Sequence, residues 1–310
     1  MRPFNTPLTF SVLGFILSSI ASINPSLHQA SAAPIPPPLT RQPANTFNNT
    51  YFPYTVTGPA PPPLYTSGSI LDSCTAPNSY AISFDDGPGQ LTDELLDYLD
   101  EQQLKVTFFM NGENWDCIYR PESQRLLKRA YQAQHQIAAH PWSHRDLDSL
   151  SDHDIRDEMY KIENAFRQIL GVVPRYMRPP YGEASERVRK VLRGLGYILI
   201  LWDVDQLNKK NPIGDETQKP MTSGHQQASF SSKWAEAVRG VPHSALDRES
   251  MMVGGIYQEA TSVWAVEYVQ NLGYDVMPVG QCLGEADPRL WYKEIGMPET
   301  EEDLPQSCYF

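Results

Sequence analysis

The sequence has few basic residues, only four cysteines and no apolar run long enough to cross a bilayer as a helix. Its 25 lysines and arginines are outnumbered by 37 aspartates and glutamates, so the net charge is −12. A surface of that sign repels phosphate backbones and argues against nucleic acid as a partner. With 41% hydrophobic and 20% charged residues, the composition predicts a globular protein rather than a multi-span membrane protein or a disordered chain.

The first 32 residues have the three-part pattern of a secretory signal peptide. Arg2 supplies a positive charge, an apolar run follows at residues 8–21, and Ala30-Ser31-Ala32 fits a cleavage site. A membrane anchor or a buried helix is the alternative interpretation of that run. We predict a signal peptide at residues 1–32 and therefore a secreted protein, extracellular or in a cell wall, with no membrane segment after signal removal.

The cysteines fit the oxidising compartment that a secreted protein enters. They are Cys74, Cys117, Cys282 and Cys308. Four cysteines allow three pairings, and the sequence alone does not choose among them. None forms a C-x-x-C pair, which argues against a zinc–thiolate site. A glycosylation sequon at residues 48–50 fits the same secretory route.

Proline is abundant, and ten of the 27 prolines lie between Pro34 and Pro63. This composition predicts an extended, semi-rigid linker over residues 33–73. A folded domain is expected over residues 74–284 and an acidic tail over residues 285–310.

Within the domain, apolar strand-like runs alternate with amphipathic stretches at helical spacing. The expected strands are 80–84, 106–110, 136–139, 175–178, 197–202 and 274–279, and the expected helices are 91–99, 125–134, 151–170, 185–195 and 263–272. This alternation predicts parallel strands and an α/β fold, a βα-repeat sheet or barrel. Residues 208–250 break the rhythm and are interpreted as a functional loop or a disordered segment.

Charged and polar side chains directly follow several of these strands. They are Asp85, Asp86, His140, Arg178 and Asp203. In a βα barrel the carboxyl ends of the strands form one face, and that face carries the active site. The convergence of several strand ends is a more specific signal than any single residue.

Two histidines in the stretch His140-Pro-Trp-Ser-His144 indicate a metal site. Residues four apart share one face of a helical turn, so both rings can reach one ion. The alternative is a pair of surface histidines by chance. Asp85-Asp86-Gly-Pro adds a carboxylate, although that stretch alone is typical of a turn. A carboxylate with two histidines and open positions is a catalytic arrangement for zinc or a similar divalent ion.

Five short stretches follow one another along the chain: residues 83–88 (SFDDGP), 111–119, 140–144 (HPWSH), 178–182 (RPPYG) and 279–284. In this order they resemble motifs of the polysaccharide deacetylase (NodB-homology) family, in its fungal chitin deacetylase branch. The resemblance runs from about residue 74 to residue 292. It implies a distorted (β/α) barrel of the NodB-homology type. It also implies a metal-dependent carbohydrate deacetylase, a hydrolase of C–N bonds other than peptide bonds.

The resemblance implies roles for particular residues. The implied ligands of Zn²⁺, or of another divalent ion such as Co²⁺, are Asp86, His140 and His144. Asp85 is implied as the general base that activates water on the metal, Arg178 as the residue that orients Asp85, and the Tyr181 backbone N–H as an oxyanion donor. Pro141 departs from the family, in which Ser or Thr is usual. The resemblance also implies a Cys74–Cys282 disulfide and, with it, Cys117–Cys308.

Two later motifs depart further from the family. The fourth keeps Asp205, but Asn208 and Lys209 stand where an aspartate and a tryptophan are usual. The fifth usually supplies a histidine as general acid, and residues 252–259 contain none. Tyr257 and Glu259 are the candidates to replace it.

The missing histidine leaves three interpretations open. The first is a working deacetylase of reduced activity that removes N-acetyl groups from chitin-like polymers. The second is a catalytically impaired protein that keeps the fold and binds carbohydrate. The third is an O-acetyl esterase, since an alkoxide leaves more easily than an amine and needs less help from an acid. In each case the expected partner is an acetylated polysaccharide such as chitin, and the expected state is a monomer.

Overall fold

The computed structural model describes residues 52–205, 244–250, 266–267 and 269–308. The predicted signal peptide, the first part of the predicted linker, the sequon, Asn208, Lys209 and residues 252–259 lie outside the described residues. All described residues belong to one unit that spans Leu39–Phe310.

A parallel sheet lies at the centre of this unit. Among the described residues nine strands form it, and all neighbours pair in parallel. The order is β1 (Ile70–Leu71), β7 (Ile198–Ile200), β6 (Tyr176–Met177), β4 (Gln136–Ala139), β3 (Thr107–Met110), β2 (Ser79–Asp85), β9 (Ser244–Ser250) and β8 (Val204–Asp205), with β10 (Asp275–Val276) also on β2. The predicted α/β fold is confirmed as a distorted (β/α) barrel whose strand order starts at β1 and ends at β8.

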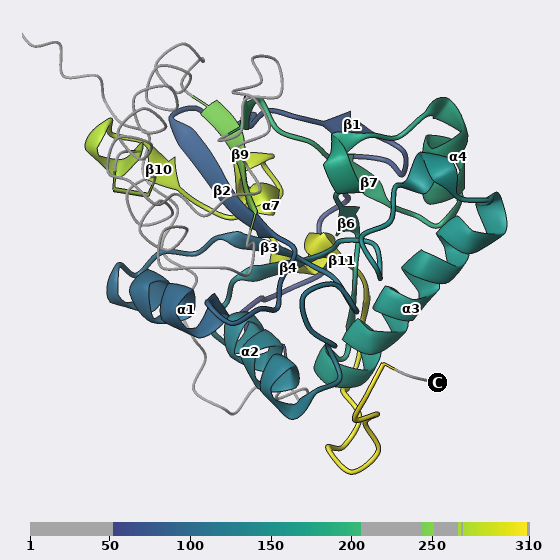
Figure 1. The fold of residues 1–310 in the computed structure, drawn as a ribbon. Coiled ribbons are helices and arrows are strands. Elements are labelled where there is room, and N and C mark those ends of the chain that lie inside the picture. Colours follow the sequence, from purple (N-terminus) through teal and green to yellow (C-terminus); the bar gives the residue numbers. More distant parts are fainter. Residues whose placement is uncertain (1–51, 206–243, 251–265, 268, 309–310) are drawn as a thin grey trace, which may run out of the picture. The chain divides into compact units, whose positions relative to one another are not determined.

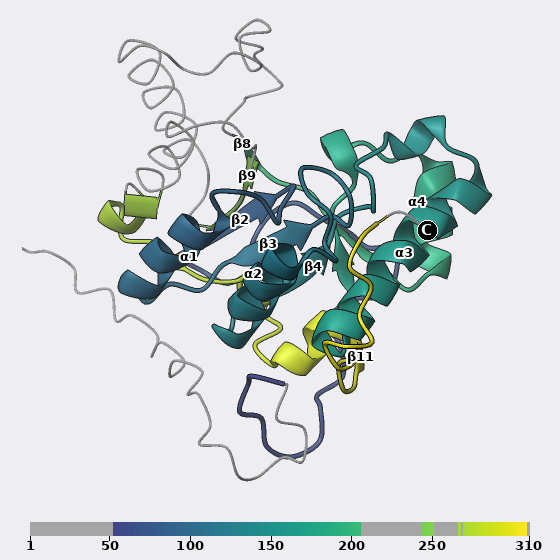
Figure 2. The same cartoon turned by 60° about the horizontal axis from the view of Figure 1, so that its bottom comes forward.

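Amphipathic helices lie beside the central strands, as Figures 1 and 2 show. They are α1 (Thr92–Glu101), α2 (Pro121–Gln132), α3 (Asp152–Leu170) and α4 (Glu186–Gly194). Helix α3 begins as its sequence predicts, because the Ser151 side chain accepts a hydrogen bond from the Asp154 backbone N–H at 3.2 Å. It ends at Gly171, whose φ of 74° is the left-handed conformation that glycine adopts without a Cβ clash.

The core explains why polar residues gather at the strand ends. Every residue of β2 is buried, and β3 and β4 are buried throughout. Phe84 of β2 stacks on Phe108 of β3 with ring centroids 5.5 Å apart. Strands covered on both faces read as continuous apolar runs, so a charged residue is expected only where such a strand leaves the core.

The segment that precedes Cys74 belongs to the fold from residue 52, which differs from the expected linker boundary at residue 73. Tyr54 is buried, and its hydroxyl donates to the His135 carbonyl at 3.0 Å. Strand β1 extends the sheet by pairing with β7. The proline content concealed this packing, because a few aromatic and aliphatic residues suffice to anchor an extended segment.

The acidic C-terminal segment, residues 285–308, also packs against the fold. Strand β11 (Tyr292–Ile295) pairs antiparallel with β5 (Val172–Pro174), and Trp291 is fully buried. The buried Glu285 carboxylate forms an ion pair with Arg175 at 3.1 Å and accepts a hydrogen bond from the Leu64 N–H at 2.9 Å. Glu285, an acidic residue of the C-terminal segment, is therefore buried and connects this segment to the N-terminal part of the described chain.

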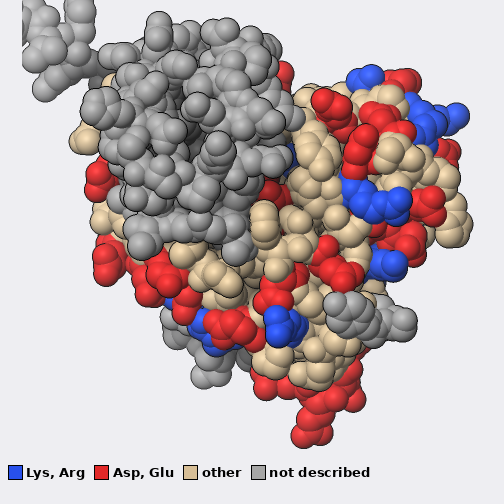
Figure 3. Space-filling view, viewed as in Figure 1, with Lys and Arg blue, Asp and Glu red and all other residues tan. Residues whose placement is uncertain are grey.

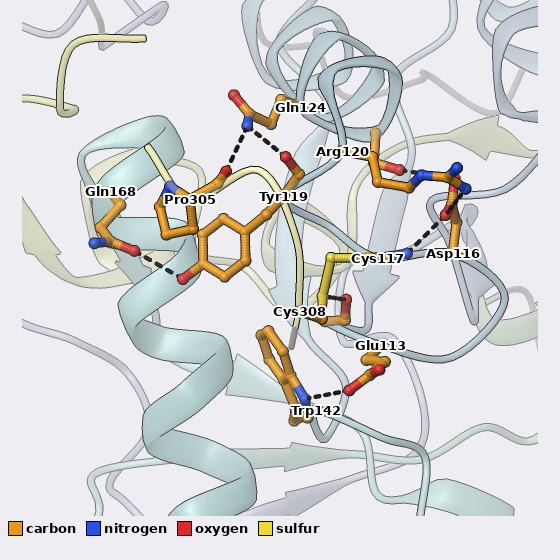
Figure 4. The surroundings of a disulfide bond; sticks show 12 residues. Glu113, Asp116, Cys117, Tyr119, Arg120, Gln124, Trp142, Gln168, Pro305 and Cys308 are labelled. Carbon is orange, nitrogen blue, oxygen red and sulfur yellow. Dashed lines mark hydrogen bonds and ion pairs between the residues drawn. A yellow bond between two sulfur atoms is a disulfide. The ribbon is translucent and has the colours of Figure 1, made fainter. Parts of the chain in front are cut away.

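Both disulfides that the resemblance implied are present, Cys74–Cys282 and Cys117–Cys308. The second fastens the C-terminal segment to the loop after β3, as Figure 4 shows. Within the described parts of the chain, no helix combines the length and the hydropathy of a transmembrane segment. On the face drawn in Figure 3, acidic side chains outnumber basic ones, in keeping with the net charge of −12.

Candidate functional site

The strand ends that the sequence singled out meet at one edge of the sheet. Asp85 ends β2, His140 follows β4 and Arg178 follows β6, and these strands are neighbours in the order β6-β4-β3-β2. Backbone hydrogen bonds link the ends of β3, β4 and β6, since the His140 N–H donates to the Met110 carbonyl at 2.9 Å and the Arg178 N–H to the Ala139 carbonyl at 3.0 Å. The end of β2 joins them because Asp85 pairs in register with Phe109 of β3. Parallel register thus brings residues almost a hundred positions apart into one site.

Asp86, His140 and His144 form a cluster that could hold a metal ion. Nε2 of His140 and Nε2 of His144 lie 3.4 and 3.1 Å from Asp86 Oδ1, and the three ligand atoms lie within 4.8 Å of one another. His140 and Asp86 are buried, and His140 Nε2 has no hydrogen-bond partner among the described residues. One carboxylate and two imidazoles are the ligand types that zinc takes in catalytic sites, so these residues fit the ion.

The tautomer of His140 follows from its second ring nitrogen. Nδ1 lies 2.6 Å from the Arg178 carbonyl oxygen, and a carbonyl only accepts hydrogen bonds. In the neutral ring the proton therefore sits on Nδ1, and the lone pair of Nε2 faces Asp86. This is the usual way in which a backbone carbonyl orients a metal-binding histidine.

The two histidines converge through a tight turn, which corrects the prediction of a helical turn. The His144 N–H donates to the Pro141 carbonyl at 3.2 Å, and His144 has a φ of 56°. Asp86 is also left-handed, with a φ of 72°. This conformation costs a non-glycine residue about 1–2 kcal/mol, and such residues cluster at functional sites. Two of the three candidate ligands therefore depend on backbone conformations that the i, i+4 spacing does not reveal.

Asp85 and Arg178 form a fully buried ion pair beside the cluster. Arg178 Nη1 donates to Asp85 Oδ1 at 2.7 Å and to Ser83 Oγ at 2.8 Å. The guanidinium lies 4.1 Å above the ring centroid of Phe109, which adds a cation–π contact in a desolvated site. The carboxylate is thereby held in one orientation next to Asp86.

Backbone carbonyls complete the environment of Arg178. Nε donates to the Ile200 carbonyl at 3.3 Å and Nη2 to the Leu201 carbonyl at 3.2 Å, both at the end of β7. Among the described residues, Ser83 and these two carbonyls thus bind the Arg178 guanidinium in addition to Asp85. Sequence reasoning missed the two carbonyl contacts, because a backbone carbonyl leaves no trace in residue type.

Tyr181 lies beside the Asp86–His140–His144 cluster. It has a φ of 61° and is 44% exposed, and its ring meets the His144 ring edge-on with centroids 5.1 Å apart. Gly182 follows, where a Cβ would lie 2.5 Å from the Trp202 ring, so this position requires glycine. Asp203 is exposed after β7, and only the backbone of Asp205, in β8, is described.

Comparison with known proteins shows which family the chain resembles. The family model "Polysaccharide deacetylase" matches residues 72–200. A chitin deacetylase from Pestalotiopsis sp is 37% identical over 229 residues, which are 74% of this chain and 71% of the relative. A chitin deacetylase from Colletotrichum lindemuthianum is 32% identical over 228 residues, which are 73% of this chain and 87% of the relative.

Solved structures of similar proteins have the same fold. The structure of the chitin deacetylase from Colletotrichum lindemuthianum superposes with a TM-score of 0.62 at 29% identity, covering 73% of this chain and 96% of that chain. A family 4 carbohydrate esterase (CE4) pseudoenzyme from Bacillus anthracis shares the fold with a TM-score of 0.55 at 18% identity, covering 71% and 70%. Because the sequence similarity spans the strands that carry Asp85, His140 and Arg178, the chain belongs to the polysaccharide deacetylase family.

Proposed function

We propose that this protein is a secreted, metal-dependent deacetylase that hydrolyses the N-acetyl groups of chitin-like polymers. The observation that carries the proposal is the Asp86–His140–His144 cluster directly beside the buried Asp85–Arg178 pair. A cation site next to an oriented carboxylate is what hydrolysis of an acetamide requires. The similarity to fungal chitin deacetylases favours chitin as the polymer.

Each residue has a defined part in this proposal. Asp86, His140 and His144 hold Zn²⁺ or another divalent ion such as Co²⁺, which lowers the pKa of bound water to about 7 when it is present. Asp85 takes the proton from the attacking water. Arg178 keeps Asp85 oriented by two contacts to the same end of β2.

The oxyanion needs a donor beside the cation. The Tyr181 backbone N–H is the proposed donor, since the left-handed residue lies next to His144 on the exposed side of the cluster. A fixed backbone donor stabilises developing negative charge without reorganising during the reaction.

The location and organisation of the chain are part of the proposal. Residues 1–32 would direct secretion, and the two disulfides suit an extracellular or cell-wall protein. The mature protein would act as a monomer on an acetylated polysaccharide. The deacetylase domain would include residues 74–284 together with the packed segments on either side.

A second candidate activity is the hydrolysis of O-acetyl esters. It is favoured by the absence of histidine from residues 252–259, where the family usually supplies a general acid. An ester depends less on that acid than an amide does, because its leaving group departs more readily unprotonated. The same absence would otherwise leave a carbohydrate-binding protein with little or no turnover.

Acetate release separates these functions. Zinc-loaded protein is incubated with chitin oligomers, partly acetylated chitosan, peptidoglycan fragments and O-acetylated xylan, with the Asp85→Asn variant as control. The proposal is supported if the wild type releases acetate from an N-acetyl substrate and the Asp85→Asn variant does not. Release from the O-acetyl substrate alone supports the esterase, and release from none of them supports a binding protein.

A further inference from the structure

We propose that Glu158 is a positioning residue of the metal site: through Ser143 it holds the turn that presents His144 to the ion. This inference rests on the proposed metal site. In the part of the chain that the structure describes, Glu158 forms hydrogen bonds with Ser143 and none with the three cluster residues, so its action is indirect. It adds a fourth side chain, from helix α3, to a site otherwise built from strand ends.

Two short hydrogen bonds join Ser143 to the Glu158 carboxylate. Glu158 Oε2 accepts the Ser143 backbone N–H at 2.7 Å, and Oε1 accepts the Ser143 hydroxyl at 2.6 Å. The Glu158 residue is only 5% exposed. A buried carboxylate that uses both oxygens on one residue forms charge-assisted bonds, which are about twice as strong as neutral ones.

Among the described residues, the hydrogen bonds that the loop after β3 makes to this turn reach residues 141 and 142, and Glu158 binds the next residue, Ser143. Asn111 Nδ2 donates to the Pro141 carbonyl at 2.5 Å, and the Gly112 and Glu113 N–H groups donate to the Trp142 carbonyl at 3.0 and 2.8 Å. These bonds fix residues 141 and 142 against the loop after β3. Pro141 has neither an N–H nor a hydroxyl to offer, so Ser143 provides both side-chain and backbone donors for the half of the turn nearest His144.

His144 needs such support more than His140 does. His140 sits at a strand end with Nδ1 held by the Arg178 carbonyl. His144 has a φ of 56°, and its side chain is 16% exposed. If Ser143 is released, the turn can relax toward a common conformation and move His144 Nε2 away from Asp86. Loss of a residue that orients a metal ligand typically weakens metal affinity about 10–100-fold.

Helix α3 supplies a matched control. Glu163 lies on the same helix and is 8% exposed, and it accepts a hydrogen bond from the Tyr197 hydroxyl at 2.7 Å and pairs with Lys293. Substitution of either glutamate removes a buried carboxylate from α3. Of these two glutamates, only Glu158 contacts the turn that carries His144.

The experiment measures the zinc affinity of metal-free protein by competition with a chromogenic chelator, together with the thermal unfolding of the metal-free form. The variants are Glu158→Ala, Glu158→Gln and Glu163→Ala. We expect Glu158→Ala to weaken zinc binding about 10–100-fold, while Glu163→Ala lowers the unfolding temperature but keeps the affinity within about threefold. Glu158→Gln keeps one carbonyl acceptor and should recover part of the loss.

The outcomes separate this inference from the proposed metal site. If the wild-type protein binds no zinc, the metal site itself is wrong and the inference falls with it. If the wild type binds zinc and Glu158→Ala stays within threefold of it, or if Glu163→Ala weakens binding as much, the positioning role is overturned while the metal site stands. If Glu158→Ala does not fold, Ser143→Ala is measured instead, and unchanged affinity in that variant overturns the inference equally.

Discussion

Arg178 and Asp85 are both inaccessible to solvent, so each depends on the other for charge compensation. Removing one partner of a buried ion pair typically costs about 3–5 kcal/mol, because the other charge stays buried. We expect Arg178→Met to lose stability of this size in urea unfolding and to abolish acetate release. Combining it with Asp85→Asn should restore part of the stability and none of the activity. If Arg178→Met and the wild type are equally stable, the Asp85–Arg178 ion pair is not a buried pair in which each charge compensates the other.

His135 is a second buried ionisable residue, and it predicts the response of the protein to acid. Burial lowers the pKa of His135 well below its usual value, and Lys105 and Arg129 add to the effect. Nδ1 accepts the Val106 N–H at 3.2 Å, so the neutral ring is the form that packs. The unfolded chain binds a proton at about pH 6.5 while the folded chain does not. Stability is therefore fully present above that pH and falls by up to about 1.4 kcal/mol per unit below it.

The variant His135→Asn tests this dependence, because its side-chain oxygen can replace Nδ1 as an acceptor without titrating. Unfolding free energies measured between pH 7 and pH 5 should fall less steeply in the variant than in the wild type. His153→Asn is the control, since His153 is on the surface with a side chain that is 89% exposed. Equal slopes for wild type and His135→Asn would contradict the assignment.

At the scale of single elements, the end of helix α3 lies tightly against the backbone of the C-terminal segment. A Cβ on Gly171 would lie 2.6 Å from the Gly296 carbonyl and 2.7 Å from the Pro298 nitrogen, which are backbone atoms of the C-terminal segment. Gly273 has a similar positive φ of 85° but open space around it. We expect Gly273→Ala to cost about 1–2 kcal/mol from the backbone conformation alone. Gly171→Ala should cost about 1–3 kcal/mol more because of the added clash, as measured by denaturant unfolding. Equal losses would contradict the contact between α3 and that segment.

The alternation of elements and the site at the strand ends could be predicted, because both follow from local apolar runs and their last residues. The turn that carries His144 could not, since the left-handed φ of a histidine has no signal in residue type. Glu158 left a signal that was missed: it lies three residues after Ile155 and one before Met159, on the buried face of α3. A charged residue within an apolar helical stripe indicates a buried partner. The partner itself, Ser143, comes from the fold and not from the spacing.

At the scale of the whole molecule, the C-terminal segment is held to the barrel by Cys117–Cys308. Figure 4 shows Gln124 and Pro305 close to this bridge, and the Gln124 amide donates to the Pro305 carbonyl at 3.3 Å. The cysteines are 191 residues apart, and closing a loop of that order stabilises by about 5 kcal/mol in the chain-entropy model. We expect the double variant Cys117→Ser/Cys308→Ser to lose several kcal/mol and to become sensitive to proteolysis near residue 305.

The other disulfide provides the comparison. Cys74 and Cys282 are 208 residues apart, so the double variant Cys74→Ser/Cys282→Ser should lose a similar amount of stability. It should leave the C-terminal segment protected from proteolysis. Cleavage near residue 305 to the same extent in both variants would contradict a local role for Cys117–Cys308.

The metal-dependence of acetate release tests the whole account most directly. Metal-free protein is titrated with zinc while bound metal and acetate release from chitin oligomers are measured in the same samples, for the wild type and for His140→Ala. The account predicts one bound zinc per chain in the wild type, acetate release that rises in proportion and stops rising at that point, and neither binding nor release in His140→Ala. Full zinc stoichiometry in His140→Ala, or undiminished acetate release by the metal-free wild type, would contradict it.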